Sequence, residues 1–127
     1  MLDGRIHVLG GGNSVSTLAT HSSYDQRTDR WENLAPLRRA KGSPAAAVLG
    51  GRIYVIGGRS GGSDVGDVDI YEPATDRWRR GPSIPPRGTV GAAMYGPSLY
   101  VFGGESQSTA FTLRDVLRLR PGARAWE

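Results

Sequence analysis

The segment Arg52-Ile53-Tyr54-Val55-Ile56-Gly57-Gly58 is an apolar run that ends in two glycines, and it has two counterparts in this 127-residue chain. The counterparts are RIHVLGG at residues 5–11 and SLYVFGG at residues 98–104, which start 47 residues before it and 46 residues after it. A period of this length is typical of repeat folds, in which each copy forms one structural unit. The β-branched and aromatic residues predict a strand buried on both faces, and the glycines predict close backbone approach at its end.

Each glycine doublet is followed by a second marker, a pair of residues with six others between them. In the second copy the pair encloses Glu-Pro-Ala-Thr-Asp-Arg, where the early Pro and the late Asp predict a tight reversal between two strands. A Leu takes the place of the first aromatic residue in the third copy. The pairs are Tyr24 and Trp31, Tyr71 and Trp78, and Leu119 and Trp126.

The order of these markers, from glycine doublet through Tyr and an acidic residue to Trp, resembles the kelch repeat over essentially the whole chain. Kelch repeats form the four-stranded blades of β-propellers. The resemblance implies an all-β fold of kelch-type β-propeller blades, each a four-stranded antiparallel meander, in an incomplete propeller. It also implies structural roles for the repeat residues and burial of Trp31 and Trp78. The repeat residues are Gly10, Gly11, Tyr24, Trp31, Gly57, Gly58, Tyr71, Trp78, Gly103, Gly104 and Trp126.

The three copies predict three blades of one partial propeller, and no stretch has the length and period of an amphipathic helix. Residues 1–41 form the first blade, with strands near 5–10, 18–25 and 30–35. Residues 42–87 form a complete second blade, with strands near 44–49, 52–57, 65–72 and 77–81. Residues 88–127 form the third, with strands near 89–95, 98–103 and 112–120 and a last strand cut short after Trp126.

The number of blades limits what the chain can do alone. A propeller has about 4–8 blades, and an open arc of fewer leaves two apolar blade faces in water. We therefore expect either a fragment of a longer propeller or a homodimer that completes a ring of about six blades.

Composition excludes some kinds of site. The chain has no Cys, which rules out disulfides and thiolate metal sites. It shows no signal peptide and no membrane-spanning stretch, so we expect no membrane partner and, by default, a cytoplasmic location. The formal net charge is +4, and all but one of the 16 basic residues are Arg, an excess that a GC-rich coding sequence also explains.

The basic residues gather in one set of predicted connections. In a four-stranded meander, the connections between blades and those between the two middle strands emerge at one end, and the tight turns emerge at the other. We expect the first end to form a basic loop face that binds a protein or another acidic ligand, because guanidinium groups bind carboxylates and phosphates. The kelch resemblance adds that this is a common ligand-binding face. The candidate binding residues are Arg38, Arg39, Lys41, Arg59, Arg79, Arg80 and Arg87.

No metal site or cofactor is expected from the histidines or the Gly-rich loop. His7 takes the place of Tyr54 and is expected in packing, whereas His21 is expected at the surface and has no neighbours at metal-ligand spacing. Residues 57–62 are Gly-rich, but a strand and not a helix follows, so they predict a flexible loop and not a phosphate site.

The acidic and hydroxyl residues give no catalytic site either. Asp67 and Asp69 point the same way near Asp64, an arrangement that suits either a cation or plain solvation. The serines named here are expected in loops and stand outside any Gly-x-Ser-x-Gly motif. They are Ser14, Ser16, Ser22, Ser23, Ser60 and Ser63.

The sequence favours a non-catalytic kelch-repeat module or scaffold that binds proteins, without deciding whether the chain is an enzyme. Two alternatives stay open: part of a propeller enzyme or carbohydrate-binding domain similar to sialic acid mutarotases, and a fragment without a function of its own. A copper site of the galactose oxidase-like propeller is excluded, because it needs a Cys and clustered His ligands and the chain has two His and no Cys. Nucleic acid is a weaker partner, since the aromatic residues are committed to the framework.

Overall fold

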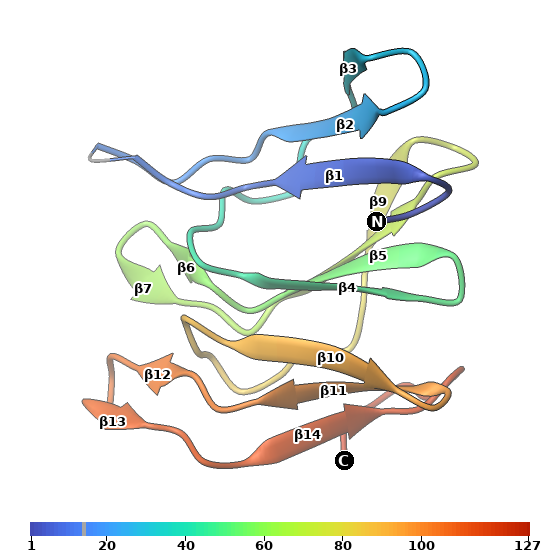
Figure 1. Cartoon of the computed structure of the whole chain (residues 1–127). Coiled ribbons are helices and arrows are strands. Elements are labelled where there is room, and N and C mark those ends of the chain that lie inside the picture. Colours follow the sequence, from blue (N-terminus) through green and yellow to red (C-terminus); the bar gives the residue numbers. More distant parts are fainter. Residues whose placement is uncertain (14) are drawn as a thin grey trace.

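The computed structural model describes residues 1–13 and 15–127, in which three larger antiparallel sheets are stacked in sequence order (Figure 1) and two shorter two-stranded sheets extend the second and third copies. The first sheet contains β1 (Arg5–Leu9), β2 (His21–Asp25) and β3 (Arg30–Asn33). The second contains β4 (Ala45–Leu49), β5 (Arg52–Ile56), β8 (Val68–Glu72) and β9 (Arg77–Arg80). The third contains β10 (Gly91–Tyr95), β11 (Ser98–Phe102) and β14 (Val116–Leu119). No helix occurs among these residues.

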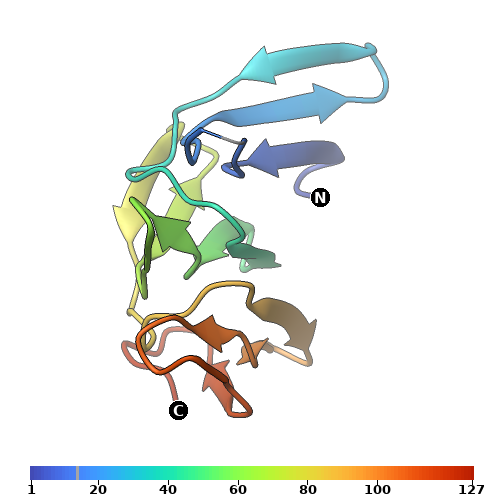
Figure 2. The ribbon, with the colours of Figure 1, turned by 90° about the vertical axis from the view of Figure 1, so that its left-hand side faces the viewer.

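Each sheet is a meander, and together the three sheets form an open arc (Figure 2). The N-terminal and C-terminal sheets lie at its opposite ends. The predicted all-β fold and its strand order are confirmed. The strand bounds lie within a few residues of those predicted, and the largest differences are in β2, β8 and β14, which are shorter than predicted. Among the described residues no strand follows β14, although Glu127 exchanges backbone hydrogen bonds of 2.8 and 2.9 Å with Arg118 of β14.

The prediction of a flexible loop at residues 57–62 is wrong, because part of this stretch is a strand. β6 (Arg59–Ser60) lies within this stretch and forms a short hairpin with β7 (Ser63–Asp64), which follows it, and the third copy has the equivalent β12 (Glu105–Ser106) and β13 (Phe111–Thr112). Arg59 also exchanges two backbone hydrogen bonds of 2.8 Å with Gly42. The stretch has regular structure because Arg59 is paired both with β7 and with the chain segment that leads into the second sheet.

The glycine doublets join each sheet to the segment that leaves it. We call residues 34–44 the first connector and residues 81–90 the second connector. Gly57 donates its backbone N–H to Asp67 of the same copy (3.0 Å), and Gly58 donates to the carbonyl of Arg87 in the second connector (2.9 Å). Both glycines have positive φ, 62° and 101°. A Cβ on Gly57 would lie 2.9 Å from the Arg87 carbonyl oxygen, so the doublet serves both the conformation and the close approach.

The repeat Trp residues bind the connectors from the other side. Trp78 Nε1 donates to the carbonyl of Ala35 and Trp126 Nε1 donates to that of Pro82, each over 2.7 Å. Trp31 has no sheet before it among the described residues, and its side chain is 60% exposed. The prediction that Trp31 is largely buried is therefore wrong, because burial of this Trp requires a preceding connector. Trp78 is half-buried against the first sheet.

The tight turns repeat a side-chain contact that explains the Tyr in the motif. Tyr24 donates its hydroxyl to Asp29 (2.7 Å), and Tyr71 donates to Asp76 (2.8 Å). Both aspartates have positive φ, 54° and 49°, a conformation that Asp tolerates better than most residues. The hydrogen bond therefore holds the turn between β2 and β3 in the first copy and the turn between β8 and β9 in the second.

The apolar core fills the two junctions between sheets. One cluster, which includes Leu37, Val55 and Tyr71, lies between the first and second sheets. Another, which includes Ile70 and Val101, lies between the second and third sheets. The two ends of the arc have exposed apolar residues: Ile6, Val8 and Trp31 form the first end face, and Phe102 and Val116 form the last end face.

Replacing Trp78 by Ala should lower the free energy of unfolding by about 3 kcal/mol, because the change removes both apolar packing and the hydrogen bond to Ala35. The same change at Trp31 should cost about 1 kcal/mol or less, since that indole loses only its contact with Tyr24. Urea denaturation followed by circular dichroism measures both values. Equal losses in the two variants would contradict the role assigned to the connector.

Candidate functional site

A pocket lined by three arginines opens where the first connector meets the second sheet. Arg38 and Arg39 come from the connector, and Arg80 comes from the end of β9. The pocket has a volume of about 280 Å³. We call it the arginine pocket. Its other lining residues are Asp67, Val68, Asp69, Gly81 and Ser83.

The arginine pocket has an excess of positive charge. Arg39 lies 3.3 Å from the carboxylate of Asp67, and both side chains are about half exposed. Asp69 is buried and pairs with Lys41, so its charge is already balanced. Arg38 and Arg80 are exposed and form no ion pair with any described residue. Two guanidinium groups are thus available to an anion, and guanidinium binds carboxylates with two parallel hydrogen bonds.

Two of the predicted binding residues do not reach the surface. Lys41 has an exposed fraction of 0%; its Nζ lies 3.0 Å from Asp69 Oδ2 and donates to the backbone carbonyl of Asp67. Arg87 is 2% exposed and donates from Nη1 and Nη2 to Asp115 over 2.7 and 2.9 Å, an arrangement that lowers the pKa of that carboxyl. Their placement on an exposed basic face is wrong, because each side chain folds inward to anchor its connector.

The remaining two predicted residues lie outside the pocket. Arg59 donates to Asp64 (3.2 Å) and to Glu105 (2.7 Å), so it links the second copy to the third, and these carboxylates, Glu105 first, raise its pKa. Arg79 is exposed on β9 but does not line the pocket. The structure therefore brings together Arg38, Arg39 and Arg80, while sequence reasoning missed Ser83.

The three aspartates considered for a cation are each paired with a basic side chain. Asp64 accepts from Arg59, Asp67 lies beside Arg39, and Asp69 lies beside Lys41. Among the described residues no cluster of His, Cys, Asp or Glu could hold a metal ion. The cation-site alternative therefore has no support in this geometry.

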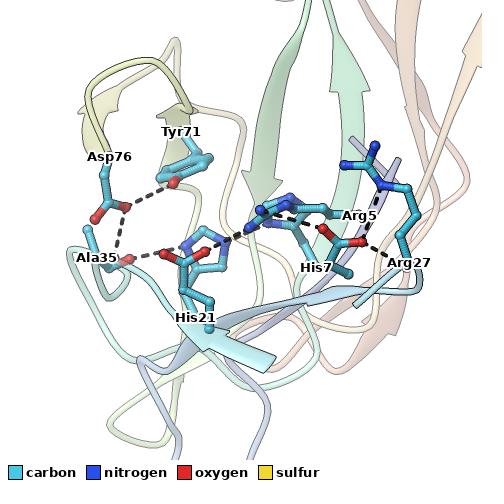
Figure 3. Close-up of polar contacts among 9 residues, drawn as sticks. Arg5, His7, His21, Arg27, Ala35, Tyr71 and Asp76 are labelled. Carbon is cyan, nitrogen blue, oxygen red and sulfur yellow. Dashed lines mark hydrogen bonds and ion pairs between the residues drawn. The ribbon is translucent and has the colours of Figure 1, made fainter. Parts of the chain in front are cut away.

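His21 is buried, with 2% of its side chain exposed, and its predicted surface position is wrong. Its Nδ1 donates to the carbonyl of Ala35 (3.2 Å), which leaves Nε2 to accept from Nδ1 of His7 (2.9 Å), as Figure 3 shows. Burial lowers the pKa of both rings, so both are neutral near pH 7. The missed signal is alternation, since His21, Ser23 and Asp25 all point inward from β2.

The serines show no catalytic arrangement. Ser22 and Ser23 lie in β2, Ser60 in β6 and Ser63 in β7, so four of the serines expected in loops are in strands. Ser14 lies outside the described residues. No serine in the described part of the chain hydrogen-bonds a histidine.

A comparison with known protein families detects the same repeat. The family model described as the Kelch motif matches residues 41–85, which include the whole second sheet and the buried Lys41. A comparison with the curated proteins found no match. A search for membrane-spanning helices in the described residues found none that is long and apolar enough.

Replacing Lys41 by Met should lower the free energy of unfolding by about 3–5 kcal/mol, because the Asp69 carboxylate is then buried without a partner. Arg87→Met should cost about 1–2 kcal/mol, because the Asp115 side chain is 46% exposed and water can replace the guanidinium. Adding Asp69→Asn to Lys41→Met should recover part of the loss. Urea denaturation measures all three variants, and equal losses for the two Met variants would contradict this difference in burial.

Proposed function

Because the chain belongs to the kelch-repeat family, we propose that it is a non-catalytic protein-binding module that holds an acidic partner in the arginine pocket. Kelch repeat domains are typically protein-binding modules. The family match includes Arg80 and Ser83, whereas Arg38 and Arg39 precede it.

The observation that carries this proposal is the charge left over in the arginine pocket. Three guanidinium groups converge there, and only that of Arg39 is paired with an exposed carboxylate. The Ser83 hydroxyl adds a neutral donor that can bind a second carboxylate oxygen. These groups suit the side chains of a Glu-rich or Asp-rich segment, because each carboxylate can accept two hydrogen bonds from one guanidinium.

The double variant Arg38→Glu/Arg80→Glu should weaken binding of an acetylated octaglutamate peptide about hundredfold, because two charge-assisted contacts are lost and replaced by repulsion. Fluorescence anisotropy of a labelled peptide measures the affinity. The matched control is Arg27→Glu/Arg77→Glu, which makes the same change of charge at exposed residues of the tight turns and should weaken binding only slightly.

Equal weakening by the two double variants would show general electrostatics and would contradict a specific pocket. Sialic acid added at excess separates the protein-binding function from the carbohydrate-binding alternative. We expect sialic acid to leave the peptide bound. If sialic acid displaced the peptide at a concentration at which chloride does not, the result would favour an acidic sugar as the ligand. No binding of either probe would remove the support for both functions.

We also propose that two copies of the chain associate through the end faces. The first end face holds Ile6, Val8 and Trp31, and the last end face holds Phe102 and Val116, all of them exposed. The same strand positions in the second sheet are occupied by Ile53, Val55 and Trp78 on one side and by Ile56 and Val68 on the other, and these pack against neighbouring sheets. Burial of such surface favours association.

Light scattering across a concentration series should give twice the mass of the chain if the end faces associate. Val8→Asp should shift the population to monomer by placing a charge in the buried contact. Val15→Asp, an equal change at an exposed loop residue, should leave the dimer intact. A wild-type monomer at all concentrations would overturn the dimer proposal.

A further inference from the structure

A cavity of about 330 Å³ lies between the first and second sheets, near the tight turns. One wall is a cross-strand row of His7, Ser23 and Glu32 in the first sheet. The facing wall includes Tyr71 and Asp76 of the second copy. The other lining residues are Leu2, Asp3, Arg5, Leu34 and Pro73. We call it the junction cavity; it is lined by none of the residues of the arginine pocket.

The next junction provides an internal comparison. Tyr54 and Ile70 are the cross-strand pair at the position that His7 and Ser23 occupy in the first sheet. Ile70 is buried in the apolar cluster between the second and third sheets, and Tyr54 packs against that cluster. The first junction therefore has smaller, polar residues where the second junction is filled with apolar side chains. A Ser side chain has two fewer non-hydrogen atoms than an Ile side chain, so space is left between the sheets.

The buried hydroxyl in the junction cavity has no partner. Ser23 is 1% exposed, and its Oγ forms no hydrogen bond with any residue that the structure describes. An unpartnered buried polar group is costly and uncommon in native proteins. The group therefore points to an occupant of the cavity that can hydrogen-bond to it.

The other polar groups determine which kind of occupant fits. Since His21 Nε2 accepts from His7 Nδ1, the neutral His7 ring has its remaining lone pair on Nε2. Asp76 uses Oδ1 to accept from Tyr71 and from the backbone of Ala35, and its Oδ2 has no hydrogen bond within the described part of the chain (Figure 3). These two remaining atoms, His7 Nε2 and Asp76 Oδ2, are therefore acceptors, and the Ser23 hydroxyl can accept as well as donate.

The charge of the cavity lining also favours an occupant that donates hydrogen bonds. Asp3, Glu32 and Asp76 are acidic, and the one basic residue, Arg5, is already paired with Glu32 over 2.7 Å. An occupant with several N–H donors and a positive charge would satisfy these groups.

We propose that the junction cavity binds a cationic side chain with the chemistry of lysine or arginine, presented by a protein partner. The ammonium or guanidinium group hydrogen-bonds Ser23 Oγ and His7 Nε2, and the carboxylates of Asp3 and Asp76 balance its charge. The site lies at the tight-turn end of β8, whereas the arginine pocket lies at the opposite end of that strand. Binding here is independent of acidic ligands in the arginine pocket.

The test is an NMR titration of the ¹⁵N-labelled chain with the acetylated, amidated tripeptides Gly-Lys-Gly, Gly-Arg-Gly and Gly-Gln-Gly. We expect saturable shifts of the Ser23 and His7 signals with the Lys or the Arg peptide, and none with the Gln peptide. The stronger of the two cationic peptides identifies whether an ammonium or a guanidinium group fits. Equal shifts with all three peptides, or none with any, would overturn the proposal.

Two variants place the binding in the cavity. Ser23→Ile, which introduces the residue found at this position of the second sheet, should weaken binding at least about tenfold by filling the space and removing the acceptor. Asp3→Asn should weaken it less, and the control Glu127→Gln removes one exposed carboxylate that lines neither the cavity nor the arginine pocket and should leave the affinity unchanged. Because Asp3 is exposed, this variant keeps the test decisive if Ser23→Ile fails to fold. Equal weakening by Asp3→Asn and the control would show general charge attraction, and undiminished binding by Asp3→Asn would place the contact outside the cavity; either result would overturn the site.

Discussion

The stack of sheets depends on hydrogen bonds to the backbone carbonyls of the connectors. Each connector accepts from the sheet before it and from the sheet after it: Gly11 donates to Lys41 and Trp78 donates to Ala35 at the first connector, while Gly58 and Trp126 do the same at the second. A side chain at Gly10 or at Gly57, the first glycine of the first two doublets, would displace the connector. The backbone contacts therefore set the distance between sheets, and the apolar clusters fill the space that this distance leaves.

The same geometry decides which basic residues are free to bind. Lys41 and Arg87 stand at equivalent places in the two connectors and turn inward, where buried or bidentate carboxylates hold them. Arg38 and Arg39 follow the buried Leu37 in the same connector, and their side chains line the arginine pocket at the edge of the second sheet. Charge that stabilises the connector is thus separated from charge available to a partner, although both come from one short segment.

The two junctions differ in chemistry despite their common backbone. The second junction is filled by Ile70, Leu99 and Val101, whereas the first contains the His7–His21 pair and the unpartnered Ser23. A repeat needs only the glycine and connector contacts to stack, so the residues between those contacts can vary. The first junction can hold polar groups because Trp78, Leu37 and Tyr71 still provide apolar contact around them.

The sequence alone determined the strands, their meander order and the turns, because these depend on local patterns such as the glycine doublets and the Tyr–Asp–Trp spacing. It also identified Arg38, Arg39 and Arg80 as residues of one face. The burial of His21, Lys41 and Arg87 and the exposure of Trp31 were decided only by the tertiary structure. Each depends on whether another sheet or connector lies against that residue. The hydrogen-bond partners of His21, Lys41, Arg87 and Trp78, the counterpart of Trp31, lie 14 to 43 residues away in the sequence. A pattern of neighbouring residues therefore does not reveal them.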